Sequence, residues 1–130
     1  MALQASSESM SIIHLKDGRE LVDFLMCEGE YRSRMPEDNH SIRLILLDIN
    51  MPRLSGLGAL EIIKSNPDLT GIPIAILSSS EAKFDIVKSY NLGANSYIKK
   101  LVDFEKFKAA MSDTVNYWLK VNRTVLSEAC

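Results

Sequence analysis

The sequence predicts an α/β domain in which a parallel sheet is covered by helices on both faces. From residue 11 onward, short apolar runs alternate with segments of helical periodicity, the order that produces βαβ units. The runs at residues 42–47 and 72–77 are apolar almost throughout, as expected of strands buried on both faces. A chain of 130 residues has room for one hydrophobic core rather than two. We therefore expect a single domain over residues 1–130.

The first half of the chain contains two expected strands, each followed by a helix. Residues 11–16 (SIIHLK) are β-branched and short, and Asp17 can cap a helix that follows. Residues 28–41 are polar and form a loop. The run at 42–47 is the next strand. The second helix begins after Ser55 and stops where Pro67 disfavours helical backbone in Asn66.

The second half continues the alternation. Residues 72–77 form a strand, residues 78–80 a polar tip, and residues 82–92 a helix ended by Gly93. Residues 96–99 give a short last strand. A final amphipathic helix, capped by Asp103, is expected to turn one apolar face to the core. Its apolar positions are Phe104, Phe107, Met111, Val115 and Trp118.

Composition excludes several classes of function. The net charge is -2, and the 15 basic residues form no run longer than Lys99 and Lys100, so a nucleic-acid surface is not expected. No apolar stretch reaches the about 20 residues that span a bilayer, and the first ten residues lack the apolar core of a signal peptide. Cys27 and Cys130 stand alone, against a disulfide or a metal site. We expect a cytoplasmic protein.

Three polar residues follow three successive strands. Asp48, Ser78 and Lys100 each stand where an expected strand ends, and parallel strands bring their carboxyl ends to one edge of the sheet. Alone, each has an ordinary role as a turn former, a helix cap or a solvated cation. Together they supply a carboxylate nucleophile, a hydroxyl donor and a balancing cation. That set suits an acyl-phosphate switch.

Three segments resemble the receiver domains of two-component response regulators. They are LLDINMPRLSG, IAILSSSEA and GANSYIKK, within a likeness that runs from residue 11 to about 121. Others, such as DGRELVDFL, resemble the single-domain regulators that serve phytochrome-type sensor kinases. The resemblance implies a flavodoxin-like three-layer fold, a sensor histidine kinase as partner and Mg²⁺ as cofactor. By position it makes Asp48 the phosphoacceptor and magnesium ligand, Asn50 a magnesium ligand through its carbonyl, Ser78 the switch hydroxyl, Lys100 the phosphate-pairing cation and Tyr97 the switch aromatic.

The chain departs from that pattern in two places. Receivers begin with an apolar strand ending in two acidic residues, whereas residues 1–10 contain only Glu8 and resemble a remnant of the first helix. Taking residues 11–126 as the receiver core, we expect weak magnesium binding or none, because Mg²⁺ is commonly held by carboxylates. Leu101 replaces the usual proline after Lys100. We expect a trans peptide bond there and a less tightly placed lysine.

The missing first strand also affects packing. In the family's strand order, 2-1-3-4-5, it lies at the centre of the sheet. The strand at residues 11–16 could pair with the one at 42–47 instead and give a four-stranded sheet. One face would still be covered only by the last helix, so we expect a homodimer or a strand-exchanged oligomer.

Several functions compete at this point. The leading one is a non-enzymatic phosphoacceptor that signals through protein–protein contacts. The alternative is a truncated or degenerate receiver that acts only as an interaction or dimerisation module. A flavin or nucleotide binder of the same architecture lacks a glycine-rich phosphate loop after its first strand. A hydrolase using residues 78–80 lacks a suitably placed histidine, since His14 and His40 lie in the first expected strand and in a polar loop.

Overall fold

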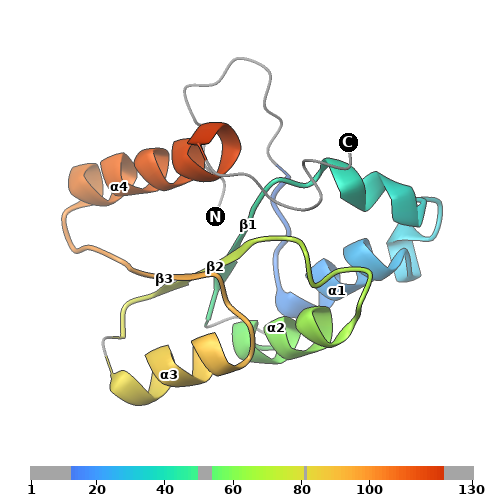
Figure 1. The fold of residues 1–130 in the computed structure, drawn as a ribbon, viewed down its shortest axis with the longest axis horizontal. Helices are drawn as coiled ribbons and strands as arrows, with labels where there is room; N and C mark the ends of the chain where they lie inside the picture. The colour runs from blue at the N-terminus through green and yellow to red at the C-terminus, as the bar shows by residue number, and fades with distance from the viewer. Residues whose placement is uncertain (1–12, 50–53, 81, 122–130) are drawn as a thin grey trace.

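The computed structural model describes residues 13–49, 54–80 and 82–121. Within these ranges the sheet has three parallel strands in the order β1-β2-β3. The strands are β1 (Ile45–Asp48), β2 (Ile74–Ser78) and β3 (Ser96–Lys99). The helices are α1 (Gly18–Met26), α2 (Gly56–Ser65), α3 (Lys83–Asn91) and α4 (Phe104–Asn116), which continues into a π-helical turn, Tyr117–Val121. The predicted parallel α/β architecture is confirmed (Figure 1).

The helices form two layers around the sheet. In Figure 1, α4 lies on one side of the sheet, and α2 and α3 lie on the other. The larger core joins α1 and α2 to one face of the sheet, through residues such as Leu25, Leu60, Leu47 and Ile76. On the opposite face Phe107 and Met111 of α4 pack with Leu77 of β2. Alternate residues of the strands therefore serve different layers.

Helix boundaries follow the capping chemistry expected from the sequence. The Asp17 carboxylate accepts the amide of Glu20 at 2.8 Å, and the Ser55 hydroxyl accepts that of Gly58 at 3.1 Å. Asp103 caps α4 by accepting the amide of Glu105 at 2.9 Å. Gly93, at φ +108°, ends the α3 segment in a backbone conformation that L side chains rarely adopt.

Two expectations about the strands and the last helix are wrong. Residues 13–15 are not in a strand, so the four-stranded sheet is not formed in the described part of the chain; residues 11 and 12 lie outside it. A β-branched segment needs a neighbouring strand as well as propensity. Phe104 is 69% exposed, so the buried stripe of α4 consists of Phe107, Met111 and Val115.

The polar segment after α1 is folded. It contains two 3-10 helices, Gly29–Tyr31 and Pro36–Ser41. Asn39 is buried and donates its side-chain amide to the carbonyl of Leu25 at 2.8 Å. The guanidinium of Arg34 donates to Asn39 and stacks over the ring of Phe24. These contacts fasten the segment to the end of α1.

Lys64 makes several hydrogen bonds at the end of the sheet opposite to Asp48. Its ammonium donates to the carbonyls of Thr70 and Ile72, both at 2.9 Å, and to the side-chain oxygen of Asn95 at 3.1 Å. Burial lowers the pKa of Lys64 below its ordinary value. The contacts link α2 to the connections that lead into β2 and β3.

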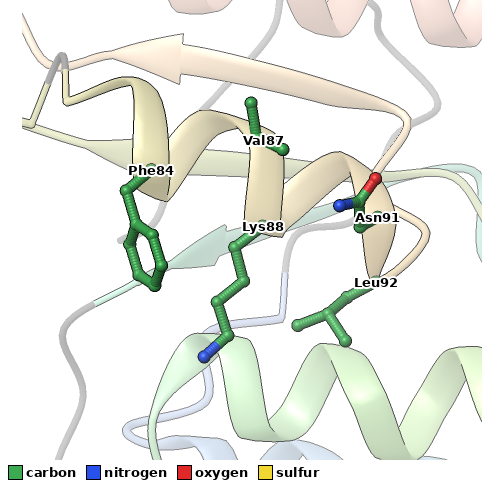
Figure 2. A pocket seen from close by; sticks show the side chains of 5 residues that line it. All are labelled: Phe84, Val87, Lys88, Asn91 and Leu92. Atoms are coloured by element: carbon green, nitrogen blue, oxygen red, sulfur yellow. The ribbon is translucent and has the colours of Figure 1, made fainter.

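Helix α3 carries two exposed apolar side chains near its start. Phe84 is 71% exposed and Val87 44%. Together with Lys88, Asn91 and Leu92 they line a shallow hollow of about 360 Å³ (Figure 2). Within the described ranges, no helix is long and apolar enough to cross a membrane.

Candidate functional site

Asp48 is the last residue of β1 and stands where the chain leaves the sheet. Its side chain is 28% exposed. Helix α2 begins close beside it, because the Gly56 amide donates to the carbonyl of Ile49 at 3.1 Å. A Cβ on Gly56 would lie 2.3 Å from the Asp48 carbonyl oxygen, so only glycine permits this approach.

Lys100 lies at the same end of the sheet as Asp48, with the central strand β2 between their two strands. It follows β3, and its amide donates to the carbonyl of Ser78 at 2.8 Å. Its ammonium forms an ion pair with the Asp48 carboxylate. The trans peptide bond at Leu101 is confirmed. The backbone bond to Ser78 and the ion pair hold both ends of the residue.

Ser78 occupies the end of the central strand, between the other two. In the ladder Asp48 pairs with Leu77, and Ser78 pairs with Lys99. Its side chain is buried, with 1% exposure, and its hydroxyl oxygen accepts the amide of Ser80 at 3.0 Å. A hydroxyl offers one donor and two acceptor sites, so this bond leaves the Ser78 O–H available as a donor.

Tyr97 lies on β3, opposite Ile76 of β2 in the ladder. The ring packs against the larger core, and the hydroxyl donates to the carbonyl of Ser80 at 2.9 Å. Ser80 thus receives a bond from Tyr97 and gives one to Ser78. The aromatic residue that the resemblance made the switch is therefore connected to the predicted switch hydroxyl through one intervening residue.

The described residues do not make up a metal site by themselves. No group of three or more His, Cys, Asp or Glu side chains that could hold an ion occurs among them. Asp48 supplies one carboxylate, already paired with Lys100. Asn50, the other expected ligand, lies outside the described ranges. Because Mg²⁺ takes near-octahedral oxygen ligation, the donors described here fit it incompletely.

The comparisons with known proteins decide the family. The family model described as "Response regulator receiver domain" matches residues 3–112. The chain belongs to the response regulator receiver family. The regulator Rcp1 of Synechocystis sp. is 35% identical over 118 residues, which cover 91% of this chain and 77% of Rcp1. FilR2 of Methanothrix harundinacea, named a probable methanogenesis regulatory protein, is 34% identical over 85% of this chain and 67% of its own length.

Solved structures agree with this assignment. The phosphorylated cyanobacterial phytochrome response regulator RcpA has a TM-score of 0.81 at 33% identity, covering 92% of this chain and 82% of RcpA. A Mn²⁺-bound crystal structure of Rcp1 has a TM-score of 0.76 at 34% identity, covering 86% of this chain and 77% of Rcp1. The receiver-type flavodoxin-like fold and the likeness to single-domain, phytochrome-type regulators are thereby confirmed.

Reasoning from the sequence missed the part played by Ser80 and Asp85. The Ser80 hydroxyl donates to the Asp85 carboxylate at 2.7 Å. The only sequence signal was the spacing of a serine a few residues before an acidic residue near a helix start, which resembles a capping pattern. Periodicity cannot show that the same serine also contacts Ser78 and Tyr97.

Proposed function

We propose that Asp48 accepts a phosphoryl group from a sensor histidine kinase. The ion pair between Asp48 and Lys100, formed at the carboxyl end of a parallel sheet, is the observation that carries the proposal. An Asp48 carboxylate oxygen would attack phosphorus, and the bond from phosphorus to the donor's imidazole nitrogen would break. The imidazole leaves and takes up a proton, and Asp48 keeps the phosphoryl group as an acyl phosphate.

Lys100 and Ser78 would stabilise the group that arrives. The acyl phosphate carries up to two negative charges at neutral pH, about one more than the carboxylate that it replaces. The Lys100 ammonium already touches the Asp48 carboxylate, so it can pair with a phosphoryl oxygen after a small movement. Ser78 ends the adjacent strand, and its O–H can donate to another of these oxygens. Such preformed donors lower the barrier because they need little reorganisation.

Mg²⁺ is the cofactor that the family implies, and we propose that this chain binds it weakly. Bound at Asp48 and the backbone carbonyl of Asn50, the ion would offset phosphoryl charge. Glu8 is the only acidic residue among residues 1–10, so that segment supplies no acidic pair. Charge compensation would then fall mainly on Lys100, and phosphorylation should be slow.

The output of the domain would be protein–protein binding in the cytoplasm. Tyr97 is the proposed switch, since its hydroxyl bond to Ser80 can respond to a change at Ser78.

A homodimer or a strand-exchanged oligomer is supported by strand β1. It is the outermost strand of the described sheet, although its sequence is as apolar as that of a central strand. Light scattering at micromolar concentration tests this; a monomer at all concentrations would refute it.

Acetyl phosphate labelling distinguishes the phosphoacceptor from the interaction module. The protein is incubated with acetyl phosphate at a series of Mg²⁺ concentrations, or with chelator, and its intact mass is followed over time. The proposal predicts slow addition of one phosphoryl group that saturates only at high Mg²⁺, and none in Asp48→Asn. Absence of label at every Mg²⁺ concentration would reject phosphorylation and favour a module that acts by binding alone.

A further inference from the structure

Ser80 joins three elements of the site at once. It lies two residues beyond the end of β2, and its amide donates to the Ser78 hydroxyl oxygen at 3.0 Å. Its carbonyl accepts from the Tyr97 hydroxyl at 2.9 Å. Its own hydroxyl donates to the Asp85 carboxylate at 2.7 Å and accepts the amide of Ala82 at 3.1 Å. Every polar group of this residue therefore has a partner.

The bond between Ser80 and Asp85 is the strongest of these by its chemistry. Its acceptor is a carboxylate, and hydrogen bonds to ionised groups are about twice as strong as neutral ones. Asp85 lies in the first turn of α3, whose N-cap residue, Ala82, has no side chain able to cap. The Ser80 hydroxyl instead bonds the amide of Ala82 itself and the side chain of Asp85. Loop and helix are thus fastened to each other at one point.

We propose that Ser80 and Asp85 act as positioning residues for the Ser78 hydroxyl, an inference that rests on the proposed function of Asp48. The carboxylate of Asp85 holds the side chain of Ser80, and this fixes the direction of the Ser80 amide. The amide occupies one acceptor site of the Ser78 hydroxyl and restricts rotation of its O–H. With Ser78 at 1% exposure, water cannot easily replace the amide.

The same contacts lead to the first two turns of α3. Asp85 is on the turn that also carries Phe84, and the next turn carries Val87 and Lys88. Figure 2 shows Phe84, Lys88 and Leu92 on the side of α3 that faces α2. When the Ser78 O–H turns to a phosphoryl oxygen, any movement of Ser80 is transmitted to the start of this helix through Asp85.

Two variants and two controls test the inference. Ser80→Ala removes the hydroxyl, and Asp85→Ala removes its acceptor. Ser80→Thr retains the hydroxyl and should restore function, and Ser79→Ala changes an exposed neighbour. Hydrogen exchange of the segment from Ser78 to Ile86 is measured in unphosphorylated protein, and labelling of Asp48 by acetyl phosphate is measured separately at a fixed Mg²⁺ concentration. Circular dichroism confirms that each variant is folded.

Ser80→Ala and Asp85→Ala should each raise hydrogen exchange in the segment from Ser78 to Ile86. Each should also slow labelling of Asp48 about tenfold, the effect of losing roughly one positioning hydrogen bond. Ser79→Ala and Ser80→Thr should behave as wild type. Unchanged hydrogen exchange in both alanine variants would overturn the proposed link from Asp85 through Ser80 to Ser78. Faster exchange with labelling at the wild-type rate would overturn the positioning role of Ser80 and Asp85. If the wild type exchanges more slowly than the two alanine variants but takes up no label, the phosphoacceptor proposal itself fails. The positioning role of Ser80 and Asp85 fails with it.

Discussion

Replacing Gly56 by alanine places a methyl group against the backbone of Asp48. The new Cβ would lie 2.3 Å from the Asp48 carbonyl oxygen and 2.7 Å from the Cα of Ile49. Since both contacts are to backbone, no side-chain rotation relieves them. Forcing atoms into packed space costs about 1–3 kcal/mol, and this case belongs at the upper end. The gain in helix propensity of up to about 1 kcal/mol offsets part of it, which leaves a loss of about 2 kcal/mol.

Gly58 provides the matched control in the same helix. A Cβ there would approach the Leu54 Cδ1 at 2.9 Å and the Ser55 hydroxyl at 3.4 Å. Leu54 Cδ1 is the end of a flexible side chain that can move. Gly58→Ala should therefore be as stable as wild type or more stable by up to about 1 kcal/mol. The two substitutions add the same methyl group and differ in what it meets.

Urea denaturation followed by circular dichroism measures the free energy of unfolding of both variants. Gly56→Ala should lower it by about 2 kcal/mol, which corresponds to a Tm lower by roughly 8 °C for a domain of this size. Labelling of Asp48 by acetyl phosphate should also slow by about tenfold or more, because the carboxylate moves relative to Lys100. Equal stability and equal labelling in the two variants would show that the close approach of α2 to β1 is not real.

Three other substitutions give distinct outcomes. Lys100→Ala should slow labelling of Asp48 about a hundredfold, the usual effect of deleting one charge-stabilising group, and an unaltered rate would exclude Lys100 from the site. Burial lowers the pKa of Lys64 in the folded state below 10.5, so between the folded and unfolded pKa values the unfolded state binds more protons and stability rises with pH. The free energy of unfolding of the wild type should therefore rise relative to that of Lys64→Met as the pH approaches 10.5. Parallel plots of unfolding free energy against pH for the two proteins would contradict this. Asn39→Ala should cost about 1–3 kcal/mol in urea denaturation because the Leu25 carbonyl loses its donor, whereas a loss below about 0.5 kcal/mol would mean that water replaces it.

The architecture could be predicted because its signals are local. The runs at residues 42–47 and 72–77 contain most of β1 and most of β2, and Asp17 and Asp103 start helices as their capping chemistry predicts. The stretch at residues 11–16 has comparable propensity, yet residues 13–15 form no strand. A strand depends on a partner, which the stretch's own sequence does not reveal.

Helical periodicity likewise shows which side of α4 faces the core and not how far the core extends. Phe104 has the right spacing, but the first turn of the helix is exposed.

The candidate site was predictable to the level of strand ends. Because parallel strands share one carboxyl edge, the positions of Asp48, Ser78 and Lys100 in the sequence were enough to place them together, and the ion pair agrees with that reasoning. The contacts of Ser80 with Asp85 and of Lys64 with Asn95 were not predictable. They depend on the conformations of connections between elements, for which the sequence carries no periodic signal.

Mapping the phosphorylated residue shows whether Asp48 is the phosphoacceptor. Protein treated with acetyl phosphate and Mg²⁺ is digested at low temperature, and the mass of the peptide that contains Asp48 is compared between wild type and Asp48→Asn. We expect a phosphoryl group on that peptide in the wild type and on no peptide in the variant. Label on another residue, or equal label in Asp48→Asn, would contradict it.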